Sequence, residues 1–130
     1  MSNNNIIKAI DNASSSNLPI IITDLYGKIV YANSKWCSQC KYNLTDIKGK
    51  TNKFLQGCLT SSDDIDIINY NVRQSKGIIH EIINFKGDDM PFRNLLEIEC
   101  LDDGYKAIVT DLGDIEYTKQ YNIMQRRLTY

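Results

Sequence analysis

The sequence predicts a single domain of the α+β class, in which a five-stranded antiparallel sheet carries short helices on one face. Strand-like runs rich in isoleucine and valine occupy residues 18–33 and 77–112, and apolar residues at helical spacing occupy residues 34–74 between them. With 130 residues and an apolar composition of 42%, the chain can build one compact core. Since no internal repeat or interior linker divides the chain, we expect one unit.

A leader helix and an exit helix are expected to flank this unit. Isoleucines at helical spacing predict a leader helix within residues 1–17, which a run of serines ends. The domain itself is expected to span residues 18–113, and a C-terminal helix residues 114–130. That helix has an apolar seam at 4, 3, 4 spacing, formed by Tyr117, Tyr121, Met124 and Leu128. The seam fits a helix that pairs with its counterpart in a second chain, and equally an amphipathic helix that lies back on the sheet.

The expected strands form a hairpin and a meander. Residues 18–24 and 28–32 read as a hairpin in which Gly27 supplies the turn. Short turns rich in glycine and aspartate separate the later strands, which makes a three-stranded meander of residues 78–86, 92–100 and 105–112.

Small helices are expected between these two groups of strands. Residues 33–40 can form a helix capped at its first or second residue, and residues 45–49 one more turn. Ser61 and Asp64 have the spacing of a capping box, and the apolar side chains of residues 65–72 recur at i, i+3 and i+7. This pattern predicts a longer amphipathic helix that faces the core.

Composition and charge exclude several classes of function. Fifteen basic and sixteen acidic residues give a net charge of -1 without a basic stripe, so nucleic acid is not an expected partner. The N-terminus does not read as a signal peptide, and the apolar run of residues 18–22 is far too short for a membrane span. We therefore expect a cytoplasmic chain without a membrane segment. No nucleophile elbow, phosphate loop or metalloprotease motif is present, so we expect no catalytic residues and no enzyme activity.

The cysteines and the single histidine raise the question of a metal or redox site. Cys37 and Cys40 form a C-x-x-C, which can be half of a metal site or a redox pair. A zinc site needs four ligands, and the remaining soft ligands, Cys58, Cys100 and His80, are scattered. We therefore expect free thiols and no metal, with redox use as the alternative. His80 alternates with apolar neighbours, which favours the polar face of a strand.

Two phrases of the sequence resemble the PAS family. Residues 22–33, ITDLYGKIVYAN, are similar to the ITDxxGxIxYAN opening of PAS domains. Residues 107–112, AIVTDL, are similar to the GVxRDIT that closes many of them. The resemblance covers about residues 18–115 and implies the PAS fold together with a sensory role.

Three further phrases resemble the flavin-binding LOV subgroup of that family. Residues 49–57, GKTNKFLQG, are similar to GRNCRFLQG, and the INFK and FRNL phrases at residues 83–86 and 92–95 are similar to INYxK and FWNL. The resemblance implies a flavin, FMN or FAD, held by Asn52, Lys53, Gln56, Asn84 and Asn94. Trp36 is expected to pack over the sheet and not to contact a ligand.

Departures from the LOV pattern change what the resemblance implies. The cysteine that bonds to the flavin under light falls at Asn52, and an amide cannot replace a thiolate. The flavin-facing glutamine of the last strand falls at Val109, or at Thr110 if the register slips by one. The arginines that hold the phosphate fall at Asp66 and Asn69, which leaves lysines, Lys53 and Lys50, as the positive groups.

Two functions therefore remain open. The first is a sensory input domain that binds a small ligand, with flavin the candidate, and relays the change through its C-terminal helix to an output domain outside this sequence. A diguanylate cyclase or a histidine kinase would fit that position, and a homodimer is the expected assembly. The alternative is a ligand-free PAS module that serves dimerisation and relay.

Overall fold

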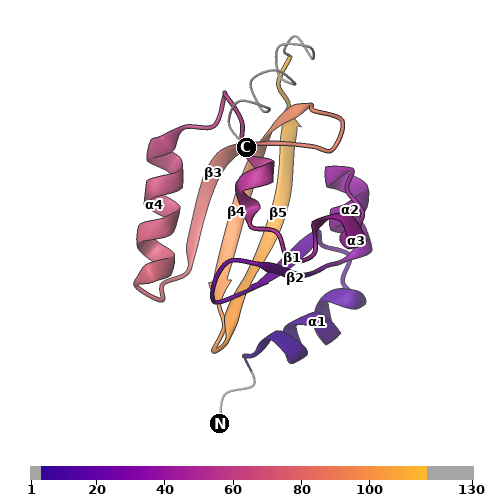
Figure 1. Ribbon diagram of the computed structural model, residues 1–130, viewed down its shortest axis with the longest axis vertical. Coiled ribbons are helices and arrows are strands. Elements are labelled where there is room, and N and C mark those ends of the chain that lie inside the picture. The colour runs from indigo at the N-terminus through magenta and orange to yellow at the C-terminus, as the bar shows by residue number, and fades with distance from the viewer. Residues whose placement is uncertain (1–3, 117–130) are drawn as a thin grey trace.

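The computed structural model describes residues 4–116, and the statements below refer to that part of the chain. Its centre is a five-stranded sheet in the order β2-β1-β5-β4-β3, in which every neighbouring pair is antiparallel (Figure 1). The strands are β1 (Ile20–Asp24), β2 (Ile29–Ala32), β3 (Ile78–Phe85), β4 (Pro91–Cys100) and β5 (Gly104–Asp114). The predicted class and the predicted strands are confirmed.

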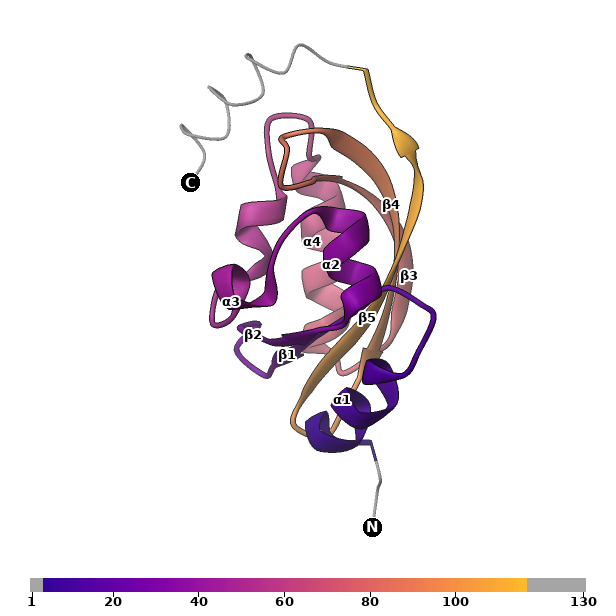
Figure 2. The same ribbon diagram turned by 90° about the vertical axis from the view of Figure 1, so that its right-hand side faces the viewer.

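Helices from the middle of the chain cover one face of this sheet. In Figure 2 they lie on one side of β3, β4 and β5. They are α2 (Ser34–Cys40), α3 (Leu44–Ile47), the 3-10 helix η1 (Asn52–Leu55) and α4 (Ser62–Arg73). No helix in the described part of the chain has the length and apolar character needed to cross a bilayer.

The leader helix α1 (Ile6–Ser14) explains why β1 is apolar on both faces. Ile20 and Ile22 pack in a cluster with Ala9 and Ala13 of α1, whereas Ile21 belongs to the larger cluster beneath the helices. Because successive strand residues point to opposite faces, α1 covers the back of β1. The uninterrupted isoleucine run follows from burial on both sides.

Asn33 is the residue that ties the leader, β1 and α2 together. Its side-chain oxygen accepts from the backbone N–H groups of Ile20 and Trp36, both at 3.0 Å. Its amide nitrogen donates to the carbonyls of Ala13 at 3.0 Å and Leu18 at 2.7 Å. Asn33 is thus the N-cap of α2, and its side chain makes four hydrogen bonds while almost fully buried.

The N-terminus of α4 differs from its predicted form. Ser61 is the N-cap, but its side chain makes no capping hydrogen bond. Asp64 instead accepts from His80 Nε2 at 2.8 Å, so the expected capping box is absent. His80 shares a strand face with Ile82 and Asn84 and points toward α4, which makes the prediction of an outward polar face wrong. The Asp64–His80 pair joins α4 to β3.

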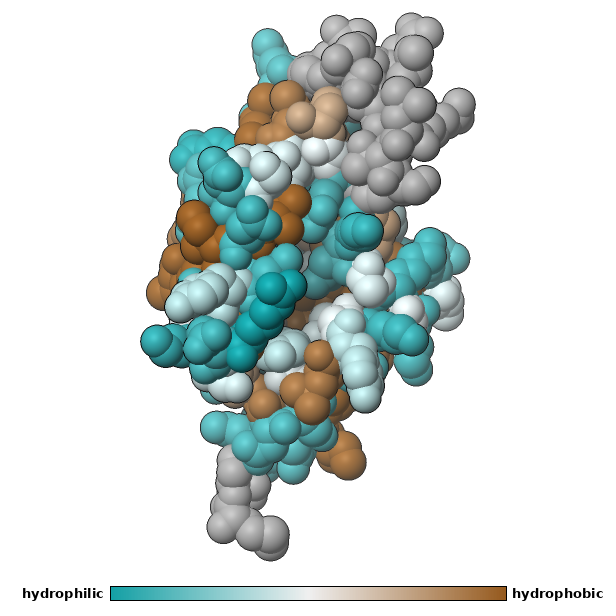
Figure 3. Space-filling model, turned by 60° about the vertical axis from the view of Figure 1, so that its left-hand side comes forward, coloured by the Kyte–Doolittle hydropathy of each residue, from teal (hydrophilic) through white to brown (hydrophobic). Residues whose placement is uncertain are grey.

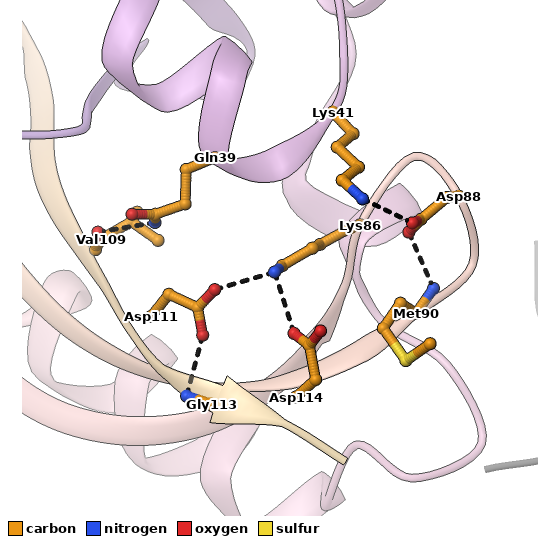
Figure 4. A network of polar contacts seen from close by, with 9 residues as sticks. All are labelled: Gln39, Lys41, Lys86, Asp88, Met90, Val109, Asp111, Gly113 and Asp114. Carbon is orange, nitrogen blue, oxygen red and sulfur yellow. Dashed lines mark hydrogen bonds and ion pairs between the residues drawn. The ribbon is translucent and has the colours of Figure 1, made fainter. Parts of the chain in front are cut away.

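A polar network surrounds the end of β5. The ammonium of Lys86 lies 2.8 Å from Asp111 and 2.9 Å from Asp114, and Figure 4 shows it between these two carboxylates. Burial lowers the pKa of Lys86, but hydrogen bonds and charges from both carboxylates outweigh it, so the net pKa is raised. Asp114 is the last residue of β5, and the predicted seam at Tyr117, Tyr121, Met124 and Leu128 lies outside the described residues.

Candidate functional site

A cavity of about 370 Å³ lies between the helix-covered face of the sheet and α2, η1 and α4. Its walls are mostly apolar. The sheet contributes Ile21, Ile82, Phe92, Leu96, Ile98, Ala107 and Val109, and the helices contribute Trp36, Leu55, Ile65, Ile68 and Val72. Alternation along the strands brings these sheet residues to one face, because side chains two apart point the same way. The volume and lining suit a small planar molecule.

Two asparagines form the polar part of the sheet wall. Asn94 pairs in register with Ile82, one step diagonal from Asn84, and both asparagines line the cavity. They are 2% and 6% exposed, and the Asn94 amide donates to Asn84 Oδ1 at 2.9 Å. The remaining oxygen, Asn94 Oδ1, is buried without a hydrogen-bond partner among residues 4–116. A buried acceptor left unpaired costs about 1–3 kcal/mol.

The η1 segment brings two of the other expected site residues to the cavity. Gln56 and Asn52 line it, whereas Lys53 is exposed and is not among the lining residues. Gly57 lies two residues beyond the end of η1, and a Cβ at this position would overlap the ring of Phe85. The glycine therefore lets η1 approach β3 closely.

The cavity lining includes a cation that sequence reasoning missed. Arg73 and Asn69 lie one turn apart on α4 and both line the cavity, as does Tyr26 of the β1–β2 turn. Asp66, which the resemblance placed at a phosphate position, is not among the lining residues. Arg73 follows Asn69 by four residues, so the two side chains lie on the same face of a helix, and this spacing is the signal that could have identified Arg73. Figure 3 shows the side of α4, where hydrophilic side chains surround scattered apolar ones.

Trp36 is a second residue that the sequence did not assign to the cavity. It is fully buried in α2, stacks on Tyr42 at a ring distance of 6.2 Å, and lines the cavity. Its Nε1 has no acceptor within residues 4–116. Buried indole N–H groups usually find a partner. Trp36 Nε1 and Asn94 Oδ1 thus belong to residues that line the cavity, but each atom has less than 1 Å² of accessible surface.

The cysteines differ sharply in their surroundings. Cys40 lines the cavity, and burial raises its pKa from the ordinary 9.0 to about 12, so its thiol is protonated at neutral pH. Cys58 is exposed, and Cys37 is half-buried. Within residues 4–116, no three His, Cys, Asp or Glu side chains converge as a metal site would require.

The register of β5 decides which residue faces the cavity at the end of the sheet. Val109 is buried and lines the cavity, whereas Thr110 is exposed on the other face. The backbone carbonyl of Val109 accepts from Gln39 Nε2 of α2 at 2.9 Å (Figure 4). A valine side chain thus occupies the position where the LOV resemblance implies a glutamine.

Known proteins resemble this chain in both sequence and fold. Phototropin-1A from Oryza sativa subsp. japonica is 32% identical over 92 residues, which cover 70% of this chain and 10% of that protein. Phototropin-2 from the same plant is 25% identical with the same coverage. The chain thus spans about a tenth of the length of these curated relatives. No protein-family model matches it.

Solved structures agree with the sequence relatives. The LOV domain of a blue-light activated histidine kinase from Erythrobacter litoralis superposes with a TM-score of 0.71 at 20% identity, covering 75% of this chain and 98% of that one. The LOV protein of Rhodobacter sphaeroides gives a TM-score of 0.75 at 18% identity, covering 87% and 70%. By its fold and its sequence relatives, the chain is a PAS/LOV-like domain.

Proposed function

We propose that this domain is a sensory input module that binds a flavin, FMN or FAD, in the cavity between the sheet and α4. The observation that carries the proposal is the pair of buried amides, Asn84 and Asn94, in the lining of an otherwise mostly apolar cavity of about 370 Å³. Amide groups in an apolar wall suit a ring that carries both hydrogen-bond donors and acceptors on one edge. The similarity to phototropins and to LOV domains supports the same ligand.

The residues of the cavity fit the parts of a flavin. Apolar side chains from the sheet and from α4 suit the faces of a planar ring, while Asn84, Asn94 and Gln56 offer amide groups to its polar edge. Asn52 lies on the same wall. Arg73, which is exposed and also lines the cavity, would hold a terminal phosphate, since its guanidinium suits two phosphate oxygens at once. Lys53, which is exposed on η1, is proposed to attract the phosphate more weakly, because solvent screens its charge.

A bound flavin would supply absorption of blue light. Asn52 stands where the resemblance implies the light-reactive cysteine, and the thiol that does line the cavity, Cys40, is held protonated by its raised pKa. We therefore expect no reversible, light-driven loss of flavin absorbance of the kind that cysteine gives. Asn52→Cys should introduce that response if the cavity holds flavin.

The proposed signal leaves the domain through the end of β5. That strand continues toward residues 117–130, where the expected helix would pair with its counterpart in a homodimer and lead to an output domain. A histidine kinase is supported as such an output by the origin of one structural neighbour, and a diguanylate cyclase is the other candidate. Both stay proposals, because the chain matches only a small part of its longer relatives.

Equilibrium titration tests the ligand. The full chain, freed of any co-purified pigment, is titrated with FMN, FAD and riboflavin while flavin fluorescence and absorbance are followed. We expect Asn94→Leu to weaken the binding of all three flavins by about tenfold or more. Asn12→Ala, at an exposed position of α1, should leave the three affinities unchanged. Arg73→Gln should weaken the binding of FMN more than the binding of riboflavin. Lys76→Gln, at an exposed position, should leave both affinities unchanged.

The ligand-free module is the competing function. If the wild-type chain binds none of the three flavins, or if Asn94→Leu binds them as tightly as wild type does, the flavin site is refuted. A colourless protein that still dimerises would then point to dimerisation and relay alone.

A further inference from the structure

The helix α4 covers the cavity without belonging to the core. None of its twelve residues is buried, whereas α1 and α2 each have buried residues. Its apolar residues Ile65, Ile68 and Val72 line the cavity, and none of the three belongs to either hydrophobic cluster of the described residues. The helix packs chiefly against β3, the edge strand of the sheet (Figure 1). Since α4 lies over a hollow, moving it away from the sheet separates few packed apolar side chains.

One polar contact joins α4 to the sheet between its two ends. The chain holds each end: Thr60, just before the helix, donates its hydroxyl to a backbone carbonyl of β3 at 2.7 Å, and the exposed residues 74–77 lead directly into β3. Among residues 62–76, Asp64 is the one residue with a hydrogen bond or ion pair to the sheet in the described part of the chain. Its carboxylate accepts from His80 Nε2 at 2.8 Å. Loss of this contact would therefore leave α4 attached by its ends alone.

We propose that α4 is a lid, which moves away from β3 about its two end connections to admit a ligand, and that the Asp64–His80 hydrogen bond is the latch that holds it closed. The inference rests on the proposed function for the identity of the ligand and adds the route by which that ligand enters. The wall that moves carries Asn69 and Arg73, so the proposed phosphate contact forms as the lid closes. The latch acts on the ligand only through the position of α4, which makes Asp64 and His80 positioning residues.

Hydrogen exchange tests the lid in the full chain without any ligand. A free helix of twelve residues is marginal in water, so α4 loses its backbone hydrogen bonds when it leaves the sheet, and its amides exchange. In the wild type we expect α4 to exchange faster than β4 and β5. Asp64→Ala should speed the exchange of α4 by about tenfold, the effect of losing one hydrogen bond to a charged group, and should leave β4 and β5 unchanged.

Two controls isolate the latch from other effects of charge. Asp63→Ala removes the neighbouring exposed carboxylate from the same first turn of α4, and we expect it to leave the exchange of α4 close to that of the wild type. His80→Leu removes the latch from the strand side. The double variant Asp64→Ala with His80→Leu should exchange no faster than the quicker single variant, because both changes break the same bond.

Binding kinetics separate a lid from an ordinary packing contact. A ligand that enters and leaves through the same opening gains speed in both directions when the latch is broken. In stopped-flow mixing with riboflavin and FMN, we expect Asp64→Ala to raise the association and dissociation rate constants together, by roughly three- to tenfold, while Kd changes by less than about twofold. A contact that only stabilises the bound form would raise the dissociation rate constant alone.

The outcomes distinguish this inference from the proposed function. If α4 of the wild type exchanges as slowly as β4 and β5, it is not a lid, whatever the cavity binds. If Asp64→Ala exchanges like Asp63→Ala, or raises only the dissociation rate constant, the Asp64–His80 bond is not a latch. If α4 exchanges as expected but the wild type binds no flavin, the proposed function fails while the lid is supported.

Discussion

Replacing Asn33 with alanine should destabilise the fold more than any other single polar truncation we can identify in the described residues. The side chain accepts from the N–H groups of Ile20 and Trp36 and donates to the carbonyls of Ala13 and Leu18. It is 1% exposed, so water cannot replace these contacts without opening the structure. Asn33→Ala would therefore disconnect the leader, β1 and α2 at once.

The magnitude follows from the number of bonds lost. A typical hydrogen bond contributes about 1 kcal/mol net, and a buried partner left unpaired costs about 1–3 kcal/mol. The four bonds of Asn33 give a loss of about 3–5 kcal/mol in the free energy of unfolding. Because small domains have roughly 5–15 kcal/mol in total, this loss is about a fifth of the stability or more.

Urea denaturation measures the change. Circular dichroism follows the fold, and fluorescence of Trp36, which lies in the helix that Asn33 caps, follows the core. For a urea slope of roughly 2 kcal/mol/M, the midpoint should fall by about 2 M. Asn12→Ala, on the exposed part of α1, is the matched control. If Asn33→Ala stays within about 1 kcal/mol of that control, the bonds do not carry the stability we assign to them.

A charge variant of Asn33 tests the direction of its hydrogen bonds. Asn33→Asp keeps oxygen acceptors for the two N–H groups but faces the carbonyls of Ala13 and Leu18 with a negative oxygen. We expect it to be at least as destabilising as Asn33→Ala. A near-neutral result would mean that the two donated bonds contribute little.

The remaining predictions concern packing, thiols and assembly. Gly57→Ala should lower stability by about 1–3 kcal/mol in urea titrations, because the added methyl would overlap a buried aromatic ring; no loss would show that the ring can move aside. A thiol reagent at neutral pH should label exposed Cys58 in the folded protein and Cys40 only after unfolding; prompt labelling of Cys40 would contradict its burial. The raised pKa of Cys40 also predicts that the free energy of unfolding falls between pH 9 and 12, because the thiol ionises at a lower pH in the unfolded chain than in the folded protein. The fall should be smaller in Cys40→Ala, and an equal fall in both proteins would exclude this thiol as the cause. The mass in solution should be that of a dimer, and Met124→Asp with Leu128→Asp should make it a monomer; a dimer unaffected by this change would remove the helix as the interface.

The sheet and its amides could be predicted because their signals are local in sequence. Alternation and turn residues marked the strands, and the spacing of the INFK and FRNL phrases placed Asn84 and Asn94 two positions from apolar residues on the same strand face. The face of His80 could not be predicted in the same way. Ile78 and Ile79 are both apolar, so the start of β3 has no alternation that distinguishes its two faces.

Arg73 and Trp36, the two cavity residues that were missed, lie at the cavity because of the way the helices pack on the sheet. The sequence does not show this packing. Arg73 lines the cavity because α4 packs along β3, and Arg73 is the last residue of that helix. For Trp36, a buried aromatic in α2 was expected, but whether its N–H would meet an acceptor depended on the neighbours that the fold brings together. An unpaired polar atom is visible only once every possible partner has been placed.

Any effect of a bound ligand on the end of β5 would need contacts between the cavity and that strand end. Val109 cannot donate or accept through its side chain, so a switch in side-chain hydrogen bonding at that position is excluded. Packing offers another path, since Phe92 lines the cavity and the ammonium of Lys86 lies 5.2 Å from the centre of its ring. Lys86 in turn bonds to Asp114, the last residue of β5. Movement of Phe92 on ligand binding would therefore act on the ion pair that fixes the end of this strand, where the chain continues toward the expected helix.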